Sequence, residues 1–76
     1  MVTFYAVQLK DVSRGSRGQD VKVLQALLNG SGFSCGTCDG IFGVKTLDAL
    51  LKFQKAVGLP AKDSVDMNTW NKLFNY

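Results

Sequence analysis

Three short amphipathic segments with defined ends constrain the fold of this chain more than any other feature. The first is predicted over about Gln19 to Asn29, the second over about Val44 to Val57, and the third over about Met67 to Phe74. In each segment apolar residues recur at three- and four-residue spacing, which is typical of one buried helix face. Because 76 residues hold one domain at most, the sequence predicts an all-α, compact three-helix bundle.

The ends of these segments carry capping signals. Ser16 and Gln19 are spaced as a capping box ahead of the first helix, and Gly30 follows that helix as a stop. Gly58, followed by Leu-Pro, is a strong stop for the second helix. Asp66 is predicted to cap the N-terminus of the third.

An internal pseudo-repeat relates the second and third segments. Three positions of the second segment match positions in or just after the third at a constant offset: Thr46, Leu50 and Phe53 match Thr69, Leu73 and Tyr76. This echo predicts two related turn-to-helix units packed against the first helix, rather than a solenoid, which needs more copies. Residues 1–11 are predicted to form an irregular or short-strand N-terminal arm or linker, and residues 12–76 the domain.

Composition narrows the range of functions. The net charge is +3, all six acidic residues are Asp, and there is no His. The missing His removes the commonest general base and metal ligand near neutral pH, so we expect no catalytic residues, no metal and no cofactor. Residues 1–10 lack the basic leader of a signal peptide. All apolar runs are short, so we expect no membrane partner.

Cys35 and Cys38 form a Cys-Gly-Thr-Cys motif for which three interpretations compete. A disulfide between them would close a very small loop and imply an oxidising compartment. A zinc site needs four ligands, so a second chain would have to complete it. A thioredoxin-like pair should follow a strand in a longer α/β chain. A disulfide or two idle thiols are favoured, and of these we predict the intramolecular disulfide.

Several motifs, in order, resemble those of the peptidoglycan-binding domain family. Residues 12–25 are similar to the opening of that family, L-R-x-G-x-x-G-x-D-V-x-x-L-Q, and residues 39–46 to its D-G-x-F-G-x-x-T. Phe53-Gln54, Gly58-Leu59 and Thr69-Trp70 match its later F-Q, G-L and T-W. The chain departs from the family at Lys62-Asp63, where Asp-Gly is frequent, and in its two cysteines.

The resemblance implies binding without chemistry. Such domains hold an attached cell-wall hydrolase, bacterial or from a phage, on peptidoglycan outside the cell, and the bound part is the glycan strand or the stem peptide. We expect a monomer joined covalently to a catalytic domain. The candidate binding residues belong to the first loop and its neighbours: Arg14, Asp39, Gly40, Ile41, Gly43, Lys45 and Thr46.

Other interpretations of these residues are open. Phe42 and Trp70 fit a helix-packing core better than a ligand platform, and Asp39 is at least as well suited to forming a turn. Gln25 and Gln54 lie on apolar faces, where each is expected to tie a loop to the bundle. The alternative function is a small helical nucleic-acid-binding domain, although the loop over residues 58–66 is long for a helix-turn-helix and no nucleic-acid partner is expected.

Overall fold

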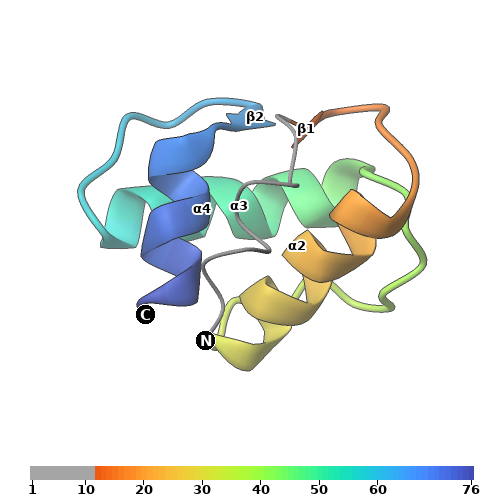
Figure 1. Cartoon of the computed structure of the whole chain (residues 1–76), viewed down its shortest axis with the longest axis horizontal. Helices are drawn as coiled ribbons and strands as arrows, with labels where there is room; N and C mark the ends of the chain where they lie inside the picture. The colour runs from red at the N-terminus through yellow and green to blue at the C-terminus, as the bar shows by residue number, and fades with distance from the viewer. Residues whose placement is uncertain (1–11) are drawn as a thin grey trace.

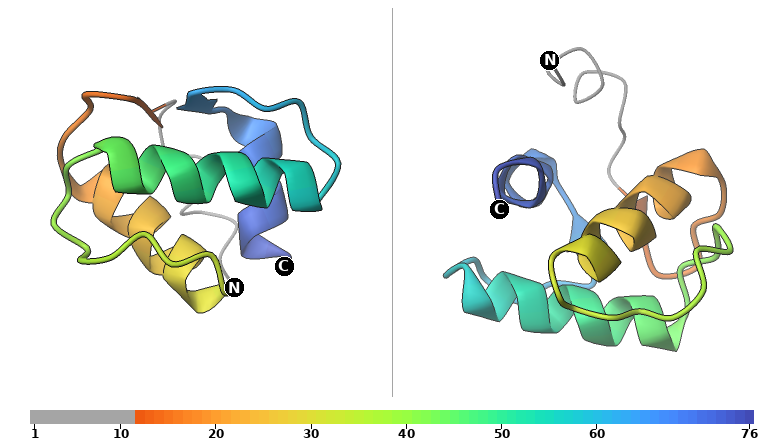
Figure 2. Two further views of the ribbon diagram at one scale, coloured as in Figure 1. Left: turned by 180° about the vertical axis from the view of Figure 1, so that it is seen from behind. Right: turned by 90° about the horizontal axis from the view of Figure 1, so that it is seen from below.

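The structure, a computed structural model, describes residues 12–76, so the predicted arm at residues 1–11 lies outside the described residues. The elements in chain order are β1 (Val12–Ser13), α2 (Gln19–Gly30), α3 (Val44–Ala56), β2 (Ser64–Val65) and α4 (Met67–Phe74). Helices α2 and α4 lie on the same side of α3, which runs across both (Figures 1 and 2). The predicted all-α three-helix fold is confirmed, with one two-residue antiparallel ladder added.

The core lies where the three helices meet. Phe42 and Trp70 are almost completely buried, as predicted, and each large apolar side chain contributes about 1.5–3 kcal/mol by leaving water. The other core side chains come from β1, from all three helices and from the segments between them: Val12, Val21, Leu24, Leu28, Cys35, Ala49, Leu50, Phe53, Val65 and Leu73.

The segment ahead of α2 joins the two turn-to-helix units. Its first residues form β1, which pairs antiparallel with β2, the strand that precedes α4 in the sequence. Further along, Arg17 forms a β-bridge with Ile41, and the Gly18 N–H donates to the Gly40 carbonyl at 2.9 Å. One strand-like segment therefore fixes both turns relative to each other and to α2.

The two units repeat one hydrogen-bonding device. Gln25 Nε2 donates to the Ile41 carbonyl at 3.1 Å, and Gln54 Nε2 donates to the Ser64 carbonyl at 3.2 Å. The amide oxygen of each Gln accepts a backbone N–H from the same turn, at 2.9 Å in both units. Both Gln side chains are buried, and their predicted role of tying a loop to the bundle is confirmed.

Helices α3 and α4 begin differently despite this repeat. Asp66 caps α4 as predicted, its Oδ1 accepting the Thr69 N–H at 3.1 Å. The corresponding position ahead of α3 is Gly43, and no side chain caps that helix. The first-turn N–H groups of α3 are therefore left for solvent or a ligand.

The expected ends of α2 are corrected by the structure. The N-cap is Gly18 and no side chain caps the helix. Ser16 does not form the predicted capping box, because its Oγ accepts the Ser13 N–H at 3.1 Å within the entry loop. Gly30, predicted as the stop, is the last residue of the helix itself.

Acid should weaken the fold through the cap of α4. The Lys62 ammonium, followed by the Thr69 N–H, lowers the pKa of Asp66. Because the folded-state pKa lies below the unfolded value of about 3.9, the stabilisation is present above that pH and is lost as pH falls through the folded pKa. We expect the urea midpoint to drop between about pH 5 and pH 2, and to drop less in Asp66→Asn, which keeps a capping oxygen without the charge. Equal drops in both proteins would contradict this.

Candidate functional site

A cleft opens between the residue 35–43 loop and the first turn of α3, and Gln25 of α2 also lines it. Its volume is about 270 Å³, just below the usual range of about 300–1,000 Å³ for small-ligand sites. It therefore has room for one small unit, such as a sugar or the end of a peptide, rather than for a stretch of polymer. The lining residues are Gln25, Cys35, Thr37, Asp39, Ile41, Gly43, Val44, Lys45 and Thr46.

Gln25 of α2 organises this cleft. Its Nε2 lies 3.0 Å from Asp39 Oδ1, 3.1 Å from the Ile41 carbonyl and 3.0 Å from Thr46 Oγ1, while its Oε1 accepts the Gly40 N–H at 2.9 Å. An amide NH₂ has two hydrogens, so the three acceptors share them. One buried side chain thus fixes the loop, the turn and the start of α3 together.

Asp39 both builds the turn and remains available to a ligand. Its Oδ1 accepts from Gln25 Nε2 and from the Ile41 N–H, both at 3.0 Å. These two hydrogen bonds, that of Gln25 first, lower the pKa of Asp39, so the carboxylate is ionised at neutral pH. Both bonds use Oδ1, and Oδ2 can accept a hydroxyl or amide hydrogen. The two interpretations of Asp39, turn-former and ligand contact, are therefore compatible.

The rim of the cleft combines apolar and cationic groups. Ile41 is 44% exposed and Val44 is 68% exposed, which is high for side chains of this type. Lys45 is exposed on the first turn of α3, and its stem passes 3.6 Å from the position a Cβ would take at Gly36. Together with the uncapped helix N-terminus, Lys45 makes this side of the cleft favourable to an anionic group.

Most of the predicted binding residues meet at this cleft. Asp39, Ile41, Gly43, Lys45 and Thr46 line it. Gly40 is buried behind the lining, where its N–H bonds Gln25.

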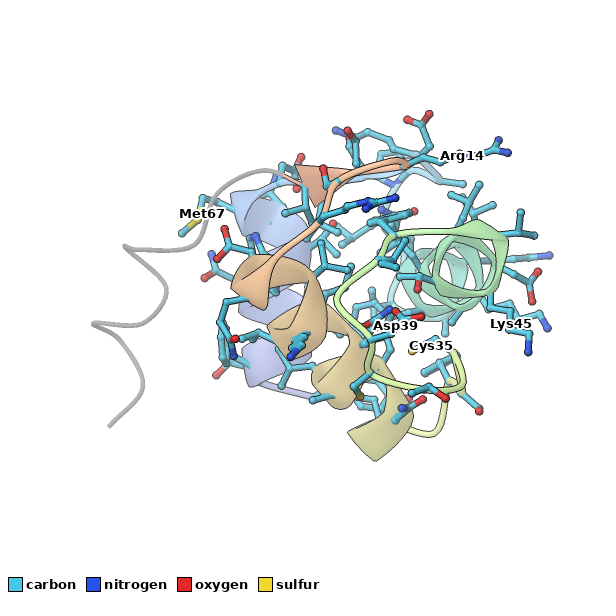
Figure 3. All side chains as sticks on the ribbon, turned by 90° about the vertical axis from the view of Figure 1, so that its right-hand side faces the viewer. Arg14, Cys35, Asp39, Lys45 and Met67 are labelled. Carbon is cyan, nitrogen blue, oxygen red and sulfur yellow. The ribbon has the colours of Figure 1, made fainter. Side chains whose placement is uncertain are left out.

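Arg14 lies elsewhere. Its backbone N–H donates to the Asp63 carbonyl at the second turn. Figure 3 shows Arg14 at the upper edge of the molecule, above Cys35, Asp39 and Lys45.

Four lining residues lie outside the predicted set. Gln25 was predicted as a structural tie, and the same hydrogen bonds that make it one place it in the cleft. Nothing in the local sequence marks Thr37 and Val44 as lining residues, because their position depends on how the loop returns to α3.

The fourth, Cys35, was predicted to form a disulfide with Cys38. Both are free thiols in the structure. The Cys35 Sγ is buried and lies 3.5 Å from the Gln25 carbonyl, whereas Cys38 is exposed.

A side chain at Gly40 should destabilise the turn. It lies at φ +77, and an added Cβ would be 3.2 Å from both the Gly18 carbonyl oxygen and Lys22 Cγ. We expect Gly40→Ala to lower the free energy of unfolding by about 1–2 kcal/mol. Gly43→Ala is the matched control, because its φ is −109° and its Cβ would meet nothing within 4 Å, so its unfolding free energy should stay within about 0.5 kcal/mol of wild type. Equal losses in the two variants, measured by urea unfolding, would contradict this account of the turn.

Residues 12–76 show no sign of two other kinds of site. No cluster of three or more His, Cys, Asp or Glu side chains gathers there around a possible metal position. None of the helices in this part of the chain is long and apolar enough to cross a bilayer.

Comparison with known proteins assigns the family. The family described as "Putative peptidoglycan binding domain" matches residues 17–73. This chain belongs to the peptidoglycan-binding domain family. The matched segment of this peptidoglycan-binding domain runs from the bridge ahead of α2 to the last core residue of α4, and it contains every residue that lines the cleft.

The curated relatives that match this chain are much longer than it. The spore cortex-lytic enzyme of Bacillus cereus is 43% identical over 63 residues, covering 72% of this chain and 24% of that enzyme. The N-acetylmuramoyl-L-alanine amidase CwlM of Mycobacterium tuberculosis is 40% identical over 57 residues, covering 75% of this chain and 14% of the amidase. The crystal structure of the SleB N-terminal domain is 38% identical with a TM-score of 0.84, covering 87% of this chain and 90% of that one. The chain thus spans about a quarter or less of these two curated relatives.

Proposed function

We propose that this domain binds bacterial cell-wall peptidoglycan without cleaving it, through the cleft at the N-terminus of α3. One observation carries the proposal. Residues 39–46 lie within the family match, and they combine a cleft, an ionised carboxylate and an uncapped helix start. Within the described residues, these three features coincide only there. In the full-length protein the domain would hold an attached hydrolase on its polymer and raise its local concentration there.

The chemistry of the cleft suits one unit of this polymer. Asp39 Oδ2 accepts a hydroxyl or amide hydrogen, and Lys45 with the start of α3 attracts a carboxylate. Ile41 and Val44 cover an apolar ring face or a methyl group. A glycosidase needs two carboxyl groups flanking the bond, and the cleft lining contains only Asp39. This composition supports binding rather than hydrolysis.

Retention on purified sacculi tests the proposal. We expect the domain to co-sediment with sacculi at high salt and to show no salt-resistant binding to duplex DNA, because nonspecific DNA binding weakens steeply as salt rises. A titration with defined muropeptides, followed by NMR, should shift the amides of residues 37–46. A domain that stays in the supernatant at every salt concentration would reject the function, and shifts confined to other residues would reject the site.

A further inference from the structure

The two cysteines contact one asparagine at the wall of the cleft. Asn29 Oδ1 accepts the Cys35 N–H at 2.8 Å, and Asn29 Nδ2 donates to the Gly36 carbonyl at 2.9 Å and to Cys38 Sγ at 3.6 Å. Gly36 takes φ +83, a conformation that turns the chain back sharply between the cysteines. One amide therefore holds both ends of the Cys-Gly-Thr-Cys loop together.

The two thiols differ in access. Cys38 is exposed, whereas Cys35 is 4% exposed and its Sγ lies 3.5 Å from the Gln25 carbonyl. Burial, and then the neighbouring Cys38, raise the pKa of the Cys35 thiol. An external reagent can thus reach one sulfur, while the other is held protonated behind it.

We propose that Cys38 is a thiol–disulfide exchange site for small-molecule disulfides, and that Cys35 resolves the adduct into an intramolecular disulfide beside the cleft. Cys38 loses its proton, and the thiolate attacks one sulfur of a disulfide RSSR, forming a mixed disulfide and releasing RS⁻, which takes up a proton to become RSH. The Cys35 thiol then loses its proton as its sulfur attacks the Cys38 sulfur, and the second RS⁻ leaves and takes up that proton. In sum, the two cysteines lose two electrons and two protons, and RSSR becomes two RSH.

Closing the disulfide changes the wall of the cleft. The effect on peptidoglycan binding that follows from this change rests on the proposed function. A disulfide requires its Cβ atoms to lie about 3.5–4.5 Å apart, so Cys38 is drawn from Asn29 toward Cys35. Thr37 lies inside the ring and Asp39 directly follows it, and both line the cleft. The Asp39 hydrogen bonds to Gln25 and Ile41 are strained by this movement. The oxidised domain therefore binds peptidoglycan more weakly.

Exposure to oxidised glutathione, followed by alkylation and peptide mass mapping, tests the exchange site. The wild-type chain should end with no alkylated cysteine and no glutathione. Cys35→Ala should stop at one glutathione on Cys38, about tenfold faster than any adduct forms on Cys35 in Cys38→Ala, because burial limits reaction. Cys35→Ser serves if Cys35→Ala loses its helical circular dichroism. Cys38 that stays alkylatable in both the wild type and Cys35→Ala, or a wild-type chain that stops at the glutathione adduct, overturns the proposal.

Sacculus retention separates the regulatory step from the proposed function. The oxidised wild type should bind about fivefold more weakly than the reduced form, the equivalent of one lost hydrogen bond. Cys38→Ala treated with the same oxidant should bind as the reduced wild type does. If the oxidised and reduced forms bind sacculi equally, the proposed effect of the disulfide on binding is overturned. Absence of binding in both redox states rejects the proposed function, and the mass-mapping result then stands by itself.

Discussion

Gln25→Met should lower the free energy of unfolding by about 3 kcal/mol and abolish retention on sacculi. The substitution keeps the length and burial of the side chain but removes an amide that bonds the loop, the turn and α3. The buried Gly40 N–H loses its acceptor, and each buried group left without a partner costs about 1–3 kcal/mol. Asp39 is released at the same time, so the cleft loses its shape.

The pseudo-repeat supplies the matched control, Gln54→Met. Gln54 bonds the Lys62 N–H and the Ser64 carbonyl at the second turn, where Lys62 is exposed and water can replace part of what is lost. We expect a loss of about 1–2 kcal/mol, with sacculus retention unchanged at a temperature where the variant is folded. Urea unfolding and sedimentation with sacculi measure the two effects. If both variants lost retention, Gln25 would act through global stability and not through the cleft.

The helices could be predicted from sequence because their signals are local. Spacing of apolar residues located α3 and α4 to within a residue, and Asp66 was recognisable as a cap from its position alone. Gln25 and Gln54 were predictable as ties because an amide on an apolar face needs partners wherever it is buried. What the sequence could not indicate is that the same Gln25 bonds would place it inside a cleft.

The errors arise where contacts cross between segments. Ser16 has the spacing of a capping residue, but β1 and the Arg17–Ile41 bridge hold the entry loop in another conformation, and its hydroxyl bonds Ser13. Arg14 was grouped with the first loop as a candidate binding residue, and the structure shows its backbone N–H bonded to the Asp63 carbonyl at the second turn. Pairing of the entry segment with both turns is a tertiary feature that no local pattern reports.

Gly43→Asp should remove sacculus binding while leaving the fold as stable as wild type or more so. The pseudo-repeat shows the geometry, since Asp66, at the corresponding position before α4, accepts the Thr69 N–H and closes that helix end. Gly43 has an extended backbone and open space around its Cβ position, so Asp fits. A cap and a favourable helix dipole contribute about 0.5 kcal/mol of stability.

The effect on binding has the opposite sign. The new carboxylate would occupy the first-turn N–H groups of α3 and place negative charge beside Lys45, at the position proposed for an anionic group of peptidoglycan. We expect retention to fall about tenfold or more, equivalent to at least about 1.4 kcal/mol of binding free energy. Gly43→Asn, which caps without charge, separates occupation from repulsion, and Gly43→Ala controls for the side chain itself. A stabilised Gly43→Asp that still bound sacculi like wild type would show that the polymer does not use the start of α3, because a ligand bound there has to compete with the new carboxylate.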